Sequence, residues 1–345
     1  MRSRRITSQD VANRAGVSRT TVSFVLNDVK EANISEETRQ RVLAAAEELQ
    51  YVPDATAQAL ASGRTRTLGM VFRRPSNTAG MVDLAHMQIL LGLMSVTSQA
   101  GVRLLVDIVN ERDPADIYLG LSRNKRIDGL ILSDPRIDDS ALYDLLNDDF
   151  PIVLLGRLPG ATVSWVEFHN RGGARAAVDH LVSQGHKQIA FIGYAPPYFT
   201  GVTERLAGYR DALAAAGIRY DERIVGFGDY NDASTAFALT TRWLELPEPP
   251  TAIFVSSDML ALATLAAIHQ HGLSIPDDVA VVGFDDNPLS RYADPPLTSV
   301  YLPFEEMGRR AGEMLLDLLL HPDEPKREML LDGQLIVRKS SSRRL

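Results

Sequence analysis

The segment GVSRTTVSFVLN, residues 16–27, joins a glycine turn to a short helix whose two faces differ in character. At helical spacing its apolar side chains fall on one face; they are Val17, Val22, Val25 and Leu26. The other face carries an arginine, two hydroxyls and a phenylalanine, namely Arg19, Thr20, Ser23 and Phe24. Because an ordinary solvated helix face would not hold an outward phenylalanine, we interpret this face as a contact surface.

The flanking segments predict two more helices. Thr7 with Asp10 three residues later forms a capping-box pattern, and Gly16 is typical of a helix end. Ser35 predicts the start of a third helix, which we expect to end at Pro53. Two helices joined by a short glycine-bearing turn and braced by a third form a helix-turn-helix arrangement. We expect this headpiece over residues 1–53, followed by a short alanine-rich hinge helix and linker over residues 54–66.

Composition limits the classes of protein that remain. The chain has 345 residues, 45% hydrophobic and 23% charged, which is ordinary for a soluble protein of two or three domains. It has no cysteine, so disulfides and thiolate metal sites are excluded. No apolar run would span a membrane and no signal-peptide core precedes the headpiece, so we expect a cytoplasmic protein. Residues 1–66 carry ten Lys and Arg against eight Asp and Glu within a net charge of −8, which favours phosphate binding at that end.

From Thr67 onward, short apolar segments alternate with amphipathic ones. We expect strands at 67–72, 103–108, 129–133, 152–156, 189–193, 224–228, 252–256 and 279–284. We expect helices at 171–184, 203–216, 231–244 and 258–271. This alternation predicts an α/β core of two doubly wound parallel-sheet lobes, with a ligand cleft where the strand ends face each other.

Several blocks along nearly the whole chain match one family in the right order. They include TSQDVANRAGVSRTTVSFVLN near the start, HLVSQGHKQIAFIG and RLAGYRDALAAAG in the middle, and IPDDVAVVGFDDNPLSRYADPPLTSV further on. With these blocks the chain resembles the lactose/galactose repressor (LacI/GalR) family. The resemblance implies a bacterial transcriptional regulator with a DNA-binding headpiece, a hinge helix and a core like type I periplasmic sugar-binding proteins. It also implies a homodimer formed through the core.

The resemblance further implies that the chain crosses three times between the lobes of a core covering residues 67–340. The N-terminal lobe would hold residues 67–165 and 297–329. The C-terminal lobe would hold residues 166–296 and 330–340.

The DNA-contacting residues follow from matching positions in the family. Arg19, Thr20 and Phe24 would face base edges in the major groove, although a polar residue is often found where Phe24 stands. Hydroxyls and helix starts would hold phosphates, while a hinge-helix leucine would wedge into the minor groove. The predicted set is Thr7, Arg19, Thr20, Thr21, Ser23, Phe24, Asn27, Ser35, Thr38, Tyr51, Ala57 and Leu60. Plain helix capping by Thr7 and Ser35, and packing of Leu60 on its own core, are the alternatives.

The effector site is predicted in the same way. A carboxylate, a guanidinium and a flat ring are what recognition of a polyhydroxylated ligand requires. The predicted set is Phe72, Arg73, Arg157, Phe199, Arg205, Tyr230, Ser257, Asp258 and Asp285. The alternatives are helix capping by Asp285 and Asp258, an ion pair of Arg205, and a core role for Tyr230. His169 replaces an acidic residue that is usual in its block, and is either structural or part of the interlobe hinge.

These observations predict a sugar-responsive repressor, active as a homodimer on a pseudopalindromic operator. Effector binding would change lobe closure, the separation of the hinge helices and the affinity for DNA, and we expect the sugar to release the operator. Phe199 stands where purine-binding members use a polar residue, which favours a sugar over a purine or another small-metabolite corepressor acting through the same parts. A periplasmic sugar-binding protein would not carry residues 1–62. An enzyme is disfavoured because we find no catalytic cluster, glycine-rich phosphate loop, cofactor motif or metal spacing.

Overall fold

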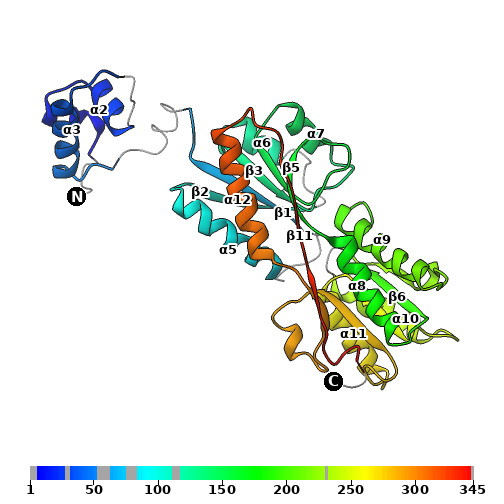
Figure 1. Cartoon of the computed structure of the whole chain (residues 1–345). Coiled ribbons are helices and arrows are strands. Elements are labelled where there is room, and N and C mark those ends of the chain that lie inside the picture. The colour runs from blue at the N-terminus through cyan, green and yellow to red at the C-terminus, as the bar shows by residue number, and fades with distance from the viewer. Residues whose placement is uncertain are drawn as a thin grey trace. The chain divides into compact units, whose positions relative to one another are not determined.

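A computed structural model describes residues 6–27, 32–52, 63–74, 84–110, 117–229 and 232–342 of the chain. Contacts divide the chain into two compact units, Met1–Arg66 and Thr67–Leu345 (Figure 1). Within the described residues, no helix combines the length and the apolar character that a membrane crossing requires.

The first unit is built from α1 (Ser8–Ala15), α2 (Arg19–Leu26) and α3 (Glu36–Glu48). The predicted capping box is confirmed, because the Thr7 side chain accepts from the Asp10 backbone while Asp10 accepts from the Thr7 backbone N–H. Gly16 ends α1 at φ +67°, a left-handed conformation that glycine adopts without steric cost. The buried side chains of the three helices form one small apolar core, which includes Val11, Val22, Val25, Val42 and Ala46.

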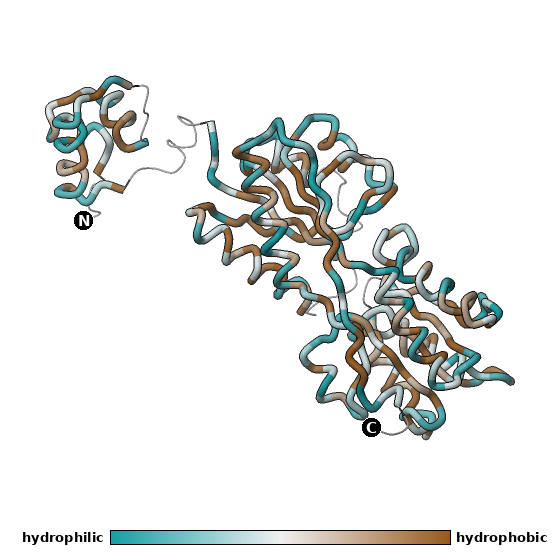
Figure 2. Tube along the Cα trace, in the orientation of Figure 1, coloured by the Kyte–Doolittle hydropathy of each residue, from teal (hydrophilic) through white to brown (hydrophobic). Residues whose placement is uncertain are grey.

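The second unit contains two six-stranded sheets, which confirms the predicted α/β class with two parallel-sheet lobes. All pairs in the N-terminal sheet are parallel, in the order β11 (Glu328–Leu331), β5 (Ser164–Phe168), β4 (Ile152–Leu155), β3 (Gly129–Ser133), β1 (Thr67–Arg74), β2 (Arg103–Asn110). The C-terminal sheet has the order β12 (Gln334–Ile336), β10 (Thr298–Tyr301), β9 (Ala280–Asp285), β8 (Ala252–Val255), β6 (Ile189–Gly193), β7 (Val225–Phe227). Among the described strands of this sheet, only β12 runs antiparallel to its neighbour, β10. The strands of both sheets are predominantly hydrophobic, as expected for sheets covered on both faces (Figure 2).

Helices cover both sheets. The N-terminal lobe has α5 (Leu84–Gln99), α6 (Ile117–Arg123), α7 (Ser140–Asn147) and α12 (Phe304–Leu320). The C-terminal lobe has α8 (Asn170–Ser183), α9 (Thr200–Ala215), α10 (Ala233–Leu244) and α11 (Asp258–Gln270). Two single 3₁₀ turns, Glu222–Ile224 and Ser290–Tyr292, complete the described helical segments.

Four strands, β5, β10, β11 and β12, were not predicted, and they correct the expected lobe boundaries. β10 was expected in the N-terminal lobe but pairs in parallel with β9 of the C-terminal sheet. β5 and β11 pair with each other along their full lengths in the N-terminal sheet, so the chain does not cross at 165/166 or 329/330. The crossings lie instead between β5 and α8, between β10 and α12, and between β11 and β12.

Glycines let paired helices approach closely in each lobe. A Cβ on Gly92 of α5 would overlap the carbonyl oxygen of Glu305, and one on Gly308 of α12 would overlap that of Ile89. A Cβ on Gly208 of α9 would likewise overlap the carbonyl oxygen of Arg171 in α8. These contacts are between backbones, so side-chain rearrangement does not relieve them, and each helix pair is held at a fixed separation.

Replacing Gly92 by alanine should therefore lower the free energy of unfolding by roughly 3 kcal/mol or more, because α5 and α12 must separate. Gly120 of α6 is the matched control, since its added Cβ has Asn124 Nδ2 as its nearest neighbour at 3.9 Å. Gly120→Ala should leave the protein unchanged or up to about 1 kcal/mol more stable. Urea unfolding of the two variants checks this, and equal effects would contradict the close-packing account.

Candidate functional site

The exposed face of α2 carries the side chains that the sequence analysis placed there. Arg19, Thr20 and Phe24 are exposed, and the Phe24 side chain is 38% accessible although it is aromatic. Val22 and Val25 on the opposite face are buried in the headpiece core. An arginine, a hydroxyl and an aromatic ring are therefore presented together on one exposed helix face.

Several of the remaining predicted DNA contacts lie at helix ends. Ser18 caps α2 and bonds to Thr21 Oγ1 at 2.9 Å, while the Thr38 backbone N–H donates to Ser35 Oγ at 3.3 Å. Ser23 Oγ accepts from Asn27 Nδ2 at 3.2 Å. Thr7 and Ser35 cap helices as the alternative interpretation expected, yet both remain exposed. Tyr51 packs on the headpiece core, and Ala57 and Leu60 lie outside the described residues.

A cleft opens between the two lobes of the core. Several lining residues, among them Ser133, Tyr194 and Asp285, stand at or just after the carboxyl ends of parallel strands, where ligands of such sheets bind. The polar lining comes from both lobes and consists of His86, Ser133, Asp134, Glu167, Asn170, Tyr194, Thr200, Arg205, Ser257 and Asp285. Three of the predicted effector residues, Arg205, Ser257 and Asp285, are therefore in the lining.

Arg205 organises the C-terminal side of the cleft. Its Nε donates to Asn170 Oδ1 at 2.9 Å, and its Nη1 donates to the Ser256 carbonyl at 2.5 Å and lies 3.6 Å from Asp285 Oδ1. The guanidinium also lies over the ring of Phe284, 4.0 Å from its centroid. The ion pair that was the alternative role for Arg205 is thus present, and it places Asp285 at the cleft wall.

Asp285 itself has φ +113°, a conformation that non-glycine residues rarely adopt. A backbone outlier at a cleft wall, beside a buried arginine, is typical of functional positions.

Asp134 and Tyr194 join the lobes across the cleft. Tyr194 Oη donates to Asp134 Oδ1 at 3.3 Å, and His86 Nε2 lies 4.0 Å from Asp134 Oδ2. Burial raises the pKa of Tyr194 well above its ordinary value, so the phenol remains a hydrogen-bond donor. Neither Asp134 nor Tyr194 belongs to the predicted effector set, although Asp134 follows β3 just as Asp285 ends β9.

Glu167 is a buried carboxylate at the cleft floor. It is 2% exposed and accepts from Arg157 Nε at 2.6 Å and from Asn170 Nδ2 at 3.3 Å. Burial raises the pKa of Glu167, while the Arg157 guanidinium opposes that rise. Arg157, predicted to contact ligand, is absent from the lining and pairs with this carboxylate instead.

Other predicted effector residues lie away from the lining. Phe72 is buried behind the cleft, with its ring centroid 4.2 Å from that of His86. Phe199 is 1% exposed in the C-terminal core, because its position before α9 turns the ring inward. The side chain of Arg73 and the whole of Tyr230 lie outside the described residues.

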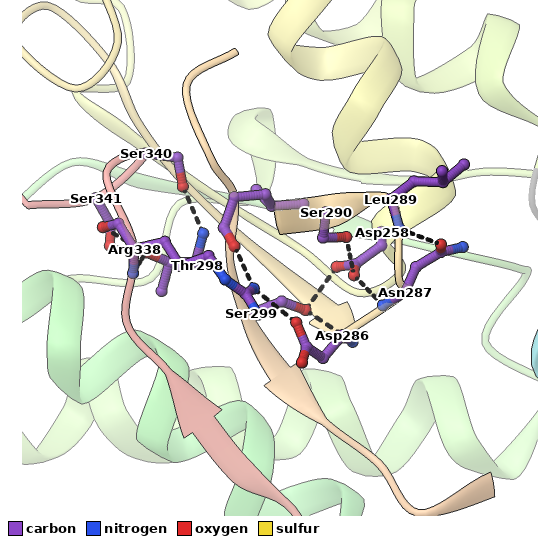
Figure 3. Close-up of polar contacts among 11 residues, drawn as sticks. Asp258, Asp286, Asn287, Leu289, Ser290, Thr298, Ser299, Arg338, Ser340 and Ser341 are labelled. Carbon is purple, nitrogen blue, oxygen red and sulfur yellow. Dashed lines mark hydrogen bonds and ion pairs between the residues drawn. The ribbon is translucent and has the colours of Figure 1, made fainter. Parts of the chain in front are cut away.

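Asp258 has a structural role, but not the helix capping that was its alternative interpretation. At the start of α11 it is fully buried and accepts from Ser290 Oγ at 2.5 Å, Ser299 Oγ at 2.6 Å and the Asn287 N–H at 2.7 Å (Figure 3). Next to it, Asp286 pairs with Arg338 of the C-terminal tail at 2.6 Å. The carboxylate thus fixes the loop after β9, directly behind Ser257 and Asp285.

His169 stands at the crossing between β5 and α8. Its backbone N–H donates to the Leu331 carbonyl at 2.9 Å, and its ring lies against Gly172, where a Cβ would overlap Nδ1. These contacts give the residue a structural role at the crossing. Over the described part of the chain, no group of three or more His, Cys, Asp or Glu residues is arranged to hold a metal ion.

The chain matches two protein families and is similar to known transcriptional regulators. The family described as bacterial regulatory proteins, lacI family, matches residues 7–54, and the periplasmic binding protein-like domain matches residues 178–341. The HTH-type transcriptional regulator CelR of Thermobifida fusca is 35% identical over 98% of this chain and 99% of its own length. The HTH-type transcriptional repressor PurR of Photobacterium profundum is 32% identical over 97% and 98%.

Two solved structures are similar over the full chain. A CelR–cellobiose complex has a TM-score of 0.74 at 34% identity and covers 97% of this chain and 100% of its own. A lac repressor dimer bound to operator and the anti-inducer ONPF has a TM-score of 0.82 at 30% identity, covering 98% and 99%.

A helix-turn-helix headpiece and a two-lobed core with a polar cleft, in one chain, define a DNA-binding regulator that responds to a small molecule. The chain belongs to the LacI family of bacterial regulatory proteins. It is a DNA-binding transcriptional repressor with a ligand-binding core.

The buried Asp258 predicts a specific pH dependence of stability. Burial raises its pKa from 3.8 to about 6, so between these values the folded chain binds more protons at this site than the unfolded chain does. The contribution of Asp258 to the free energy of unfolding should therefore fall as the pH rises from about 4 to about 6. The difference in unfolding free energy between wild type and Asp258→Asn, measured by urea titration across this range, should decrease with pH. A difference that stays constant or increases with pH would contradict a raised pKa of Asp258.

Proposed function

We propose that this repressor binds operator DNA as a homodimer and releases it when a sugar fills the interlobe cleft. The observation that carries the sugar assignment is a pair of buried hydroxyls, one from each lobe. Ser133 Oγ and Ser257 Oγ line the cleft, both residues are 2% exposed, and neither hydroxyl has a hydrogen-bond partner among the described residues. A buried hydroxyl without a partner costs about 1–3 kcal/mol, which a hydroxyl-bearing ligand would recover.

The other groups at the cleft suit the same ligand. Asp285 and Glu167 supply acceptors, while Arg205 and Tyr194 supply donors, and a polyhydroxylated molecule uses both. The similarity to a CelR–cellobiose complex supports a sugar as effector. The second candidate is a corepressor, a purine or another small metabolite, in the same cleft, which the similarity to PurR favours.

DNA binding is assigned to the exposed face of α2. Arg19 would grip a guanine or a phosphate, and Phe24 would pack on a thymine methyl. The capped starts of α1 and α3, at Thr7 and Ser35, present backbone N–H groups suited to phosphates. The similarity to a lac repressor structure bound to operator supports this assignment.

Exposed apolar side chains support the homodimer. Met87, Leu91 and Met94 recur at helical spacing on α5, and each is at least 44% exposed. Val106 and Ile108 are exposed on the edge strand β2 of the same sheet. An apolar surface of this kind is favoured at a protein–protein contact, and the similar lac repressor structure is a dimer.

The mechanism follows from contacts made by both lobes. A ligand that touches Ser133 on one lobe and Ser257 on the other stabilises one relative arrangement of the lobes. That arrangement would alter the separation of the two hinge segments in the dimer and so the affinity for DNA, typically by about 1–3 kcal/mol.

Arg19→Ala should weaken binding to an operator selected from random duplexes by about 10- to 100-fold, because a bidentate base contact is lost. Arg175→Ala is the control. Arg175 lies on α8 of the C-terminal lobe, is exposed and pairs with Asp179, so its loss should leave operator affinity unchanged. Fluorescence anisotropy at fixed salt measures both affinities. Equal affinities of Arg19→Ala and wild type would reject the role of α2.

Ser133→Ala and Ser257→Ala should each weaken sugar binding without lowering the free energy of unfolding. Each variant should bind neutral sugars, tested as a panel that includes cellobiose, about 3- to 10-fold more weakly, because a ligand hydrogen bond is lost. Neither should lower the free energy of unfolding, because each hydroxyl has no partner in the described structure.

Thr241→Val is the matched control, since Thr241 Oγ1 is also buried without a partner but lies outside the cleft lining. It should leave sugar affinity unchanged. Calorimetric titration checks all three variants. Unchanged sugar affinity in both serine variants would reject the proposed contacts.

A further inference from the structure

Arg157 connects carboxylates of the two lobes. It follows β4 of the N-terminal sheet, and its Nε donates to Glu167 Oε2 of β5 at 2.6 Å. Its Nη2 lies 3.6 Å from Glu204 Oε2 on α9 of the C-terminal lobe. One guanidinium is therefore shared between a carboxylate of its own lobe and one of the other lobe.

Glu167 continues this connection to the cleft wall. Its Oε1 accepts from Asn170 Nδ2 at 3.3 Å, and Asn170 Oδ1 accepts from Arg205 Nε at 2.9 Å. Arg205 lies 3.6 Å from Asp285 and directly follows Glu204 in α9. Four side-chain contacts and the Glu204–Arg205 backbone link thus join Arg157, Glu167, Asn170, Arg205 and Glu204 in a closed circuit, which we call the hinge ring.

The position of the hinge ring makes it sensitive to lobe closure. Asn170 is the first residue of α8, directly after the crossing from β5, so the Glu167–Asn170 bond spans a point where the chain changes lobe. The Arg157–Glu204 pair spans the lobes by contact alone, and its side chains are 43% and 32% exposed. A partly exposed ion pair can separate at low cost, whereas the buried Glu167 carboxylate must keep its partners.

We propose that the hinge ring transmits occupancy of the cleft to lobe closure, with Glu167 and Glu204 as positioning residues on either side of Arg157. The proposal rests on the proposed function of the cleft. A ligand that engages Asp285 and Arg205 shifts Asn170, which changes how Glu167 holds Arg157. The strength of the Arg157–Glu204 pair then differs between the two lobe arrangements, and this difference biases their equilibrium.

A double-mutant cycle tests the proposal, because contiguity alone does not establish coupling. The full-length wild type, Glu204→Gln, Glu167→Gln and the double variant are compared. Glu306→Gln is the matched control, since Glu306 pairs with arginines on its own helix α12 and lies outside the hinge ring. For each protein, operator affinity is measured with and without a saturating sugar chosen from the panel. The ratio of the two affinities is the coupling factor.

We expect Glu204→Gln to keep its sugar affinity within about 3-fold of wild type, because Glu204 is absent from the cleft lining. Its coupling factor should fall at least about 5-fold. The double variant should lose no more coupling than the larger single loss, because both residues act through Arg157. The control should retain the wild-type coupling factor.

Three results would overturn the proposal. A wild-type coupling factor in Glu204→Gln, or additive losses in the double variant, would show that the hinge ring does not act as a unit while leaving the sugar-responsive function intact. If the wild-type protein itself has a coupling factor of one with every sugar in the panel, both the proposed function and this inference are rejected.

Discussion

The ligand-binding core of this repressor depends on the hydrogen bonds and the ion pair that stabilise one buried guanidinium, that of Arg205. Of the lysine and arginine side chains in the described ranges, Arg205 is the one that is buried, at 6% exposure. A buried guanidinium is tolerated only when its donors are paired, and loss of a partner costs about 3–5 kcal/mol. Arg205 meets this requirement with Asn170, the Ser256 carbonyl and Asp285, which come from α8, the end of β8 and the end of β9. The same contacts that stabilise the charge therefore bring three elements together at the cleft.

Around this centre, the contacts within lobes and between lobes differ in kind. Within each lobe, glycine backbones hold helix pairs at fixed separation, as in α5 with α12 and α8 with α9. Across the cleft, the contacts are polar and replaceable, namely Tyr194 with Asp134 and Arg157 with Glu204. Rigid lobes joined by such contacts favour a small number of discrete arrangements over continuous deformation. This is the property that a ligand-controlled DNA-binding protein requires.

The sequence was sufficient for features that depend on neighbouring residues. The Thr7–Asp10 capping box, the Gly16 helix end and the eight strands of the predicted set are local patterns, and the structure contains them. β5 and β10 escaped prediction because no α-helix separates them from β4 and β9, the strands before them, so they fall outside the strand–helix alternation. β11 and β12 escaped because they are short tail strands whose pairing with β5 and β10 depends on the fold. Asp258 illustrates the same limit at the site, since its burial depends on Ser290 and Ser299, which only the fold brings to it. Phe199 was assigned to the cleft from a matched position, but the turn before α9 directs its ring into the core. The rule that located Asp285 could also have located Asp134, because both stand at the carboxyl ends of parallel strands.

If ligand binding in the cleft and DNA binding by the headpiece are coupled, each must change the affinity of the other by the same factor, and this can be measured on the unmodified protein. Sugar affinity is measured by calorimetric titration on the free protein and on the protein saturated with operator. The account predicts that operator weakens sugar binding by the same factor by which sugar weakens operator binding. Identical sugar affinities in the free and operator-bound states would contradict it.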